Sequence, residues 1–336
     1  MIILGIESSC DETSAAAVKN GREVLSNVTA SQAEIHAKYG GVVPEIASRA
    51  HTEAIGPLCE QALAQAGVSI HDIDVIAATY APGLIGALLV GLNFAKALAY
   101  KQNLPFVPVH HIKGHIAAAY LDYPELEPPF LAFVASGGHT SILDINSYLD
   151  YKILGATRDD AIGEAFDKIA RVMGLGYPGG AEIEKLAELG DKLAVKMPLA
   201  KVENNALDFS FSGVKTHVIN YINTLAQKNI GLTEQDRQNI AASFTENAVQ
   251  SVTSRIKYAL EMTRHKKLVC AGGVLANSHI RAALKNLCDK SGVSLYIPNK
   301  KYCGDNAAMI AAQAYYEHLV GNIGQFSQNA FATHEF

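Results

Sequence analysis

The chain contains the same strand–turn–strand pattern twice, at positions about 130 residues apart. In the first copy, two apolar runs flank a turn of small and acidic residues at positions 8–14. In the second copy, two apolar runs flank the turn Ala-Ser-Gly-Gly-His-Thr at positions 135–140. A repeat of this kind indicates two related lobes that face one another, each built around one copy.

Both turns are suited to binding phosphate groups. Backbone amides in a turn of small residues can point at a phosphate because no side chain blocks the approach. A single turn of this kind is more typical of an ordinary hairpin. Two of them, from lobes that face one another, could hold the phosphates of a nucleotide between them.

Strands and helices alternate between the two copies. Residues 44–67 have apolar positions at helical spacing, residues 73–79 form a strand-like apolar run, and a second helix ends near Tyr100. A short strand follows at 106–109. This alternation is typical of an α/β fold with a doubly wound or mixed sheet.

Three histidines follow that last strand, in the sequence His-His-Ile-Lys-Gly-His at 110–115. On a helix, His111 and His115 lie one turn apart and can converge on one metal ion. The spacing alone is also common among histidines that only form hydrogen bonds. It is not the zinc-protease pattern, because Ile112 stands where those enzymes have a glutamate as general base.

A protein site for zinc or iron(II) usually needs a third ligand and an open coordination position. The candidate is Asp305, which follows the segment 295–298 and precedes the helix expected at 307–319. The alternative is that Asp305 only caps that helix, which is the commonest role of aspartate at such a position.

Composition narrows the classes of function. The 336 residues are 49% hydrophobic and 18% charged, which favours a large packed core, and the formal net charge of −5 gives no general basic character for binding nucleic acid. The five cysteines form no C-x-x-C pair, so a reduced, cytoplasmic protein is expected. The apolar tract 84–100 contains Gly86, Gly91, Asn93 and Lys96, and therefore indicates a buried helix rather than a membrane span.

Taken together, the motifs resemble the universal tRNA adenosine threonylcarbamoyltransferases in their bacterial form, a family formerly described as glycoprotein endopeptidases. The resemblance runs nearly from end to end. It rests on the motifs GIESSCDET, YGGVVPE, HHIKGH, SGGHT, GEAFDK, DFSFSG and AGGV, in this order.

The resemblance implies the two-lobed actin-like ATPase fold of acetate and sugar kinases, heat-shock ATPases and actin, with a duplicated ribonuclease-H-like core and a cleft between the lobes. The first lobe would comprise residues 1–110. Residues 111–336 would comprise the metal-binding helix, the second lobe with the adenylate site, and a C-terminal helix that packs back on the cleft. Members transfer threonylcarbamoyl from threonylcarbamoyl-adenylate to N6 of the adenosine beside the anticodon (position 37 of tRNAs that read codons starting with A), and release AMP.

Carried over residue by residue, the resemblance implies that His111, His115 and Asp305 bind one divalent metal, with iron(II) favoured and zinc possible. Asp11 and Glu12 are the candidates for orienting the nucleophile or assisting proton removal. The substrate-binding residues implied around the adenylate, where ATP, ADP or AMP could also bind, are Val134, Ala135, Ser136, Gly137, Gly138, Asp167, Gly180, Glu184 and Asn277.

Two positions depart from the family pattern. Glu184 stands where many members have aspartate, and Gly304 replaces a hydroxyl residue beside Asp305. The expected partners are tRNA and the helper proteins of the modification complex, the inactive paralogue TsaB and the ATPase TsaE, with no membrane. Two other functions stay open from the sequence: a metalloendopeptidase, and a nucleotide-gated scaffold of the same fold without catalytic activity.

Overall fold

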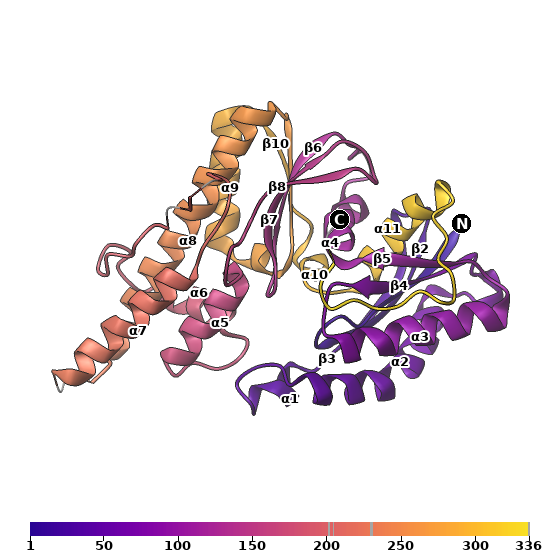
Figure 1. Cartoon of the computed structure of the whole chain (residues 1–336), viewed down its shortest axis with the longest axis horizontal. Helices are drawn as coiled ribbons and strands as arrows, with labels where there is room; N and C mark the ends of the chain where they lie inside the picture. Colours follow the sequence, from indigo (N-terminus) through magenta and orange to yellow (C-terminus); the bar gives the residue numbers. More distant parts are fainter. Residues whose placement is uncertain (201, 204, 229–230, 335–336) are drawn as a thin grey trace. The chain divides into compact units, whose positions relative to one another are not determined.

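The computed structural model describes residues 1–200, 202–203, 205–228 and 231–334, and the chain separates into two compact units (Figure 1). Unit 1 consists of Met1–Pro128, Asn146–Tyr151 and Pro298–Phe336. Unit 2 consists of Pro129–Ile145 and Lys152–Ile297. Each unit is built on a five-stranded sheet.

The sheet of unit 1 has the order β3-β2-β1-β4-β5. Strand β1 pairs antiparallel with β2, from Ile2 opposite Lys19 to Glu7 opposite Ser14, and parallel with β4. The predicted hairpin around positions 8–14 is therefore confirmed. The strands are β1 (Ile2–Glu7), β2 (Glu12–Lys19), β3 (Glu23–Ser31), β4 (Val75–Ala81) and β5 (Phe106–His110).

Helices cover both faces of this sheet, as Figure 1 shows. Side chains alternate along a strand, so Leu4 and Ile6 of β1 pack toward one face and Ile3 toward the other. The first face is covered by α2 (Pro44–Ala66) and α3 (Ile85–Gln102), and the second by α4 (His111–Asp122) and α11 (Ala307–Leu319). Short helices α1 (Ala33–Ala37), η1 (Ile70–Asp72) and α10 (Lys300–Cys303) complete the unit.

Unit 2 repeats the topology of unit 1. Its strand order, β8-β7-β6-β9-β10, corresponds one to one with β3-β2-β1-β4-β5. Strand β6 pairs antiparallel with β7 and parallel with β9, as β1 does with β2 and β4. The internal repeat predicted from the sequence is confirmed in the strands β6 (Phe130–Ala135), β7 (Thr140–Ile145), β8 (Tyr151–Ala156), β9 (Lys267–Ala271) and β10 (Ser294–Tyr296).

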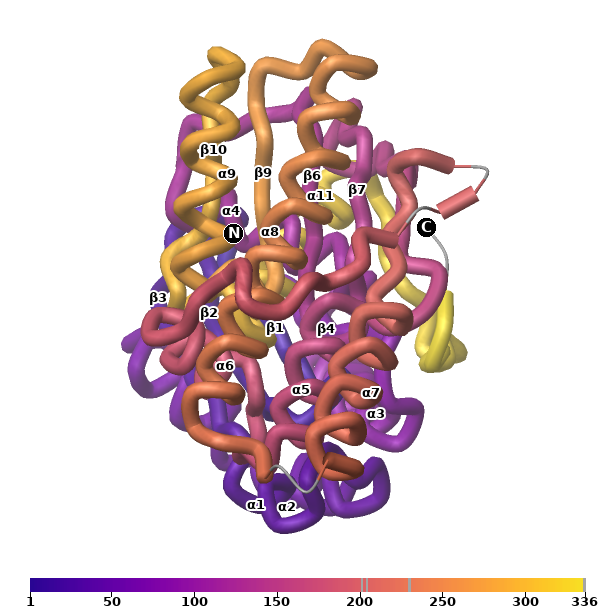
Figure 2. The backbone as a smooth tube through the Cα atoms, turned by 90° about the vertical axis from the view of Figure 1, so that its left-hand side faces the viewer, coloured from indigo at the N-terminus to yellow at the C-terminus, as the bar shows by residue number. Residues whose placement is uncertain are grey.

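The longest helix of unit 2 is α8 (Glu234–Thr263), which contacts β6 and β7 and lies beside α6 and α9 (Figure 2). It begins with a capping box in which Thr233 and Asp236 satisfy each other's backbone amides. The other helices are α5 (Ile162–Val172), α6 (Gly179–Ala187), α7 (Ser212–Gln227), α9 (Ser278–Ser291) and the short η2 (Gly273–Ala276).

The compact units differ from the division at residue 110 expected from the sequence. The histidine-bearing helix α4 starts where β5 ends and packs against α11, and α11 covers the sheet of unit 1. Both helices therefore belong to unit 1 because that is where their apolar residues are buried. All five cysteines are free thiols. Among the residues described, no helix is long and apolar enough to cross a membrane.

Candidate functional site

Helix α4 places the two predicted histidines in a buried position. The side chain of His110 caps the helix by accepting a hydrogen bond from the backbone N–H of Ile112. His111 and His115 follow on one face, with ring centroids 4.6 Å apart. His115 is completely buried and His111 is 5% exposed.

Asp305 is positioned by the start of α11. The N-cap of this helix is Asn306, whose side chain accepts from the backbone N–H of Met309. Asp305 is therefore not the helix cap, and its carboxylate is left to face α4. Gly5 of β1 allows α11 to pack closely against this strand, because a Cβ at this position would lie 2.9 Å from the backbone nitrogen of Ala311.

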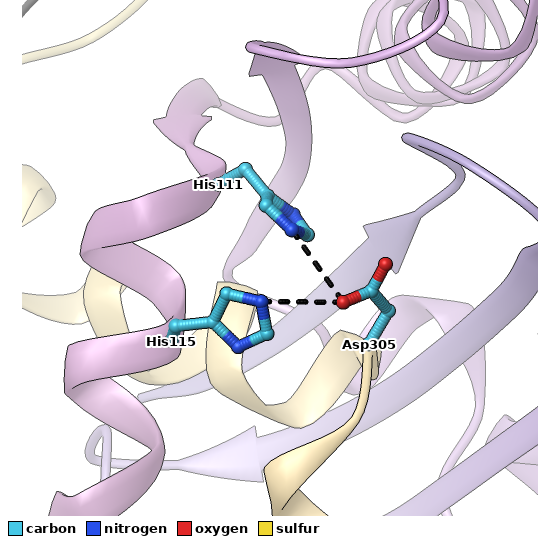
Figure 3. A group of neighbouring side chains, drawn as sticks. All are labelled: His111, His115 and Asp305. Carbon is cyan, nitrogen blue, oxygen red and sulfur yellow. Dashed lines mark ion pairs between the residues drawn. The ribbon is translucent and has the colours of Figure 1, made fainter. Parts of the chain in front are cut away.

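The three side chains converge, as Figure 3 shows. Oδ1 of Asp305 lies 3.2 Å from Nε2 of His115 and 3.5 Å from Nε2 of His111. One potential ligand atom from each residue lies within 4.8 Å of the other two. The structure thus brings together the three residues that the sequence predicted as metal ligands.

Electrostatics in the cluster, without a metal ion, favour the charged forms of His111 and Asp305 and the neutral form of His115. Burial alone would lower the pKa of His111, but the carboxylates of Asp305 and Glu7 raise that pKa well above its usual value. Burial likewise opposes ionisation of Asp305, but His111 and His115 hold the pKa of Asp305 well below its usual range. His115 is different, because burial lowers its pKa and the neighbouring His111 lowers it further. His115 is therefore kept neutral, as a metal ligand must be.

The donor set fits a divalent metal. Two imidazole nitrogens and one carboxylate are typical ligands of zinc and of iron(II), and three protein ligands leave a coordination position open. Both ring nitrogens of His115 are buried; Nε2 has the 3.2 Å contact with Asp305, and Nδ1 has no hydrogen-bond partner within the described part of the chain. Unpaired buried nitrogens are costly unless a ligand satisfies them. The cluster is compatible with a metal site.

The predicted catalytic carboxylates lie in the turn between β1 and β2. Asp11 is buried, and Glu12 is the first residue of β2. Burial and the neighbouring carboxylates of Asp305 and Asp11 raise the pKa of Glu12 to about 9. This shift favours the protonated form of Glu12, which can donate a hydrogen bond. The catalytic role of Asp11 and Glu12 stays a prediction.

Unit 2 contains a pocket of about 300 Å³. The N-termini of three helices meet there: Gly163 is the second residue of α5, Gly180 is the second residue of α6, and Asn277 caps α9. Helix N-termini present unpaired amides and a partial positive charge, which favour an anion such as a phosphate.

Two carboxylates also line the pocket and are held in place by neighbouring groups. Asp167 accepts a hydrogen bond from the backbone N–H of Gly179, at 2.8 Å. Glu184, the departure from the family pattern, accepts from the backbone N–H and the hydroxyl of Ser278, at 2.8 and 2.6 Å. Glu184 thereby connects α6 to the start of α9.

The predicted substrate-binding residues divide into two groups. Gly137, Asp167, Gly180, Glu184 and Asn277 line the pocket. The other four are not among its lining residues: Val134 and Ala135 are fully buried in β6, Ser136 is 7% exposed, and Gly138 is exposed in the turn of the hairpin.

The sequence did not assign the remaining lining residues of the pocket. All of them are apolar or glycine, so residue type gave only a weak signal, although several lie inside the motifs that carried the resemblance. At position 163 the requirement for glycine is steric, because a Cβ on Gly163 would lie 2.6 Å from the carbonyl oxygen of Ser136. The unassigned residues are Gly163, Phe166, Pro178, Ala181, Gly273, Val274 and Ala276.

Comparison with solved structures shows the fold. The (R)-2-hydroxyglutaryl-CoA dehydratase component A of Acidaminococcus fermentans superimposes with a TM-score of 0.56 at 16% identity, covering 95% of this chain and 99% of that one. The ROK hexokinase of Thermus thermophilus gives 0.50 at 14% identity, covering 95% and 100%. These similarities agree with the predicted two-lobed α/β fold of the actin-like ATPases.

Comparison with protein sequences shows the family. The family model of TsaD, tRNA N6-adenosine threonylcarbamoyltransferase, matches residues 23–312. The enzyme of that name from Clostridium perfringens is 52% identical over 329 residues, covering 98% of this chain and 96% of its relative. The one from Caldicellulosiruptor saccharolyticus is 50% identical over 331 residues, covering 98% and 97%. The chain therefore belongs to the tRNA N6-adenosine threonylcarbamoyltransferase family.

Proposed function

We propose that this protein transfers the threonylcarbamoyl group of threonylcarbamoyl-adenylate to N6 of the adenosine beside the anticodon of tRNA and releases AMP. The observation that carries the proposal is the buried cluster of His111, His115 and Asp305 in a chain of this family. A relative without catalytic activity would have no chemical need to keep two buried imidazoles and a carboxylate together.

The adenylate part of the donor is assigned to the pocket of unit 2. Amides at the N-termini of α5, α6 and α9 suit its phosphate, and the carboxylates of Asp167 and Glu184 suit ribose hydroxyls, which donate hydrogen bonds. The pocket also favours departure of AMP, the leaving group. As the bond between the carbamoyl carbon and the phosphate oxygen breaks, negative charge stays on the phosphate, and the helix N-termini stabilise it.

The threonylcarbamoyl part of the donor is assigned to the metal cluster. His111, His115 and Asp305 would hold one divalent ion, with iron(II) favoured and zinc as the alternative. When bound, such an ion supplies a Lewis acid that polarises an oxygen of the acyl group. The cluster is almost closed to solvent, since Asp305, the most exposed of the three, is only 19% exposed at its side chain. Exclusion of water protects the reactive donor from hydrolysis.

Asp11 and Glu12 are proposed to act on the nucleophile. The adenine N6 amino group is a weak nucleophile, so its orientation contributes more than a strong base does. As the new C–N bond forms, N6 loses a proton, and Asp11 is the proposed acceptor. Glu12, whose raised pKa favours its protonated form, is proposed to donate a hydrogen bond to a substrate acceptor.

The proposed partners follow from the substrate. With a formal net charge of −5, the chain has little overall attraction for a polyanion, so helper proteins, TsaB and TsaE in bacteria, are proposed to contribute to tRNA binding. The reaction is assigned to the cytoplasm, where tRNA is available.

The test is a nucleoside mass analysis of tRNA after incubation with threonylcarbamoyl-adenylate and the metal-loaded protein, with and without the helper proteins. Wild type and the His71→Ala variant, which changes an exposed histidine, are expected to form the modified adenosine, and His111→Ala is expected to lose it. Absence of product from wild type with competent helpers would overturn the proposal in favour of the scaffold. Cleavage of a glycoprotein by wild type but not by His111→Ala would favour the endopeptidase.

A further inference from the structure

Glu7 is a fully buried carboxylate at the end of β1, next to the metal cluster. The rest of β1 is apolar or glycine, as expected for a central strand. Burial of a charged group is costly unless its oxygens are hydrogen-bonded. The identities of its partners therefore indicate what this carboxylate does.

Three groups contact the carboxylate of Glu7, and one of them belongs to a proposed metal ligand. Its Oε1 accepts from the backbone N–H of Ser9, at 2.5 Å. Its Oε2 accepts from the hydroxyl of Thr79, at 2.5 Å, and lies 3.1 Å from Nδ1 of His111. The carboxylate is thus held by the turn after β1 and by β4, and presents Oε2 to the imidazole.

This contact fixes the ring of His111. A carboxylate that already accepts from the N–H of Ser9 and the hydroxyl of Thr79 is an acceptor toward Nδ1 of His111 as well. Nδ1 of His111 must therefore carry the proton. Nε2, on the other edge of the ring, is left to act as a ligand, and it is Nε2 that lies 3.5 Å from Oδ1 of Asp305.

The two histidines of the cluster differ in this respect. Nδ1 of His115 is buried and has no hydrogen-bond partner among the described residues. His111 has Glu7 at 3.1 Å, and the hydroxyl of Ser9 lies 3.2 Å from the same Nδ1. Orientation by a carboxylate is thus provided for His111 and not for His115.

We propose that Glu7 is a positioning residue, which holds the ring of His111 with its proton on Nδ1 and its Nε2 directed at the metal ion. The inference rests on the proposed metal site and adds a residue to it. Carboxylates that accept from the far nitrogen of a ligating histidine orient the ring and increase its basicity.

The first test is a titration of the metal-free protein with zinc ion in competition with a chelating dye. Glu7→Gln keeps the shape, but an amide oxygen cannot replace both carboxylate oxygens as acceptors for Ser9 N–H and His111 Nδ1–H. We expect this variant to bind zinc about 10- to 100-fold more weakly than wild type. The matched control is Glu317→Gln, a change at a second buried carboxylate of unit 1, 4% exposed, which accepts hydrogen bonds from Lys113, Gln313 and Asn322.

His115→Ala distinguishes failure of this inference from failure of the metal site. If His115→Ala loses zinc binding while Glu7→Gln binds as wild type does, the role of Glu7 is overturned. If His115→Ala also binds zinc as wild type does, the metal site itself is overturned.

The second test observes the proton directly. In the zinc form labelled with ¹⁵N in its histidine rings, wild type is expected to show a slowly exchanging Nδ1–H signal, assigned to His111 by its absence in His111→Ala. Glu7→Gln is expected to shift this signal or lose it through exchange with water, and Glu317→Gln to leave it unchanged. A purely structural role of Glu7 would not move it.

Thr79→Val tests the proposal if Glu7→Gln does not fold. Valine keeps the size of threonine but removes the hydroxyl that donates to Oε2 of Glu7. The His111 Nδ1–H signal is then expected to shift, with a severalfold weaker zinc affinity. An unchanged signal and affinity in a folded Thr79→Val protein would overturn the proposal.

Discussion

Asp305 and Asn306 are consecutive residues with separate tasks: Asn306 caps α11, and Asp305 directs its carboxylate to within 3.2 Å of Nε2 of His115. Because Asn306 satisfies the amide of Met309, α11 does not need Asp305 for its stability. The cap and the candidate ligand can therefore be changed independently.

Asp305→Asn is expected to lose metal binding and keep the fold. The amide is a weak ligand and cannot supply the negative charge that the carboxylate provides, so the zinc affinity should fall by more than about 100-fold. Zinc competition with a dye measures the affinity, and circular dichroism checks that the helix content is unchanged.

Asn306→Ala is the matched control for Asp305→Asn. Loss of the cap should lower the free energy of unfolding by about 1 kcal/mol, measured in urea, while zinc affinity remains within severalfold of wild type. Equal loss of zinc binding in both variants would mean that the start of α11, rather than the carboxylate of Asp305, decides metal affinity.

The sequence predicted the elements with strong local patterns. The paired hairpins, the long helices and the convergence of His111 with His115 follow from periodicities of two and 3.6 residues, which depend only on neighbours in the chain. Strand β3 was not predicted. Its segment carries polar residues such as Ser26 and Asn27, and its pairing with β2 depends on contacts that a local pattern does not contain.

The site was predictable where residue type carries chemistry. Histidines and an aspartate at the starts of helices indicated candidate ligands, and the family resemblance named five of the residues that line the pocket, whose binding role stays a prediction. Glu7 was not assigned a role, because its importance depends on a distance of 3.1 Å to a residue more than a hundred positions away. The apolar pocket residues gave only a weak signal for the same reason, since only the fold brings them together.

The pocket of unit 2 depends on the absence of a side chain at Gly163. A Cβ there would lie 2.6 Å from the carbonyl oxygen of Ser136 and 2.9 Å from Cα of Gly137. Both are backbone atoms, and displacing the backbone costs more free energy than moving a flexible side chain. Gly163→Ala is expected to cost about 1–3 kcal/mol of stability and to weaken AMP binding, measured by calorimetry. Gly213→Ala, where a Cβ would meet nothing within 4 Å, is the control, and weaker AMP binding there too would contradict this explanation.

Arg22 anchors the segment Asn146–Tyr151 within unit 1. Its guanidinium donates to the carbonyl oxygens of Tyr123 and Leu126 and to the hydroxyl of Tyr148, and lies 5.1 Å from the ring centroid of Tyr120. A lysine cannot reproduce this fork of donors. Arg22→Lys is expected to lower the free energy of unfolding by about 1–3 kcal/mol in urea.

Arg49→Lys is the control for Arg22→Lys. Arg49 is 77% exposed at its side chain and pairs only with Glu45 among the ion pairs of the described chain, so a change of less than about 0.5 kcal/mol is expected. A similar loss of stability in both variants would show that the geometry around Arg22 has no special importance.

His51 makes the stability of unit 1 dependent on pH. It is fully buried in α2, its Nε2–H donates to the carbonyl oxygen of Cys10, and its Nδ1 accepts from the hydroxyl of Thr13, at 2.9 and 2.7 Å. These bonds hold the turn between β1 and β2, and they require the neutral ring. Burial lowers the pKa of His51 below its ordinary value of 6.5, although Glu7 and Asp11 partly oppose this.

The lowered pKa of His51 fixes the direction of the pH effect. Between the folded pKa and 6.5, the unfolded chain binds the proton and the folded protein does not. The stability contribution of the neutral ring is therefore present above pH 6.5 and is lost as the pH falls below it, by at most about 1.4 kcal/mol per pH unit.

His51→Gln, which cannot take up this proton, is expected to be less stable at pH 8 and to lose less stability between pH 6.5 and 5. The exposed His71→Gln is the control, and urea unfolding across this pH range is the measurement. If His51→Gln keeps the full pH dependence of wild type, the acid sensitivity comes from other groups, and His51 only packs against the turn.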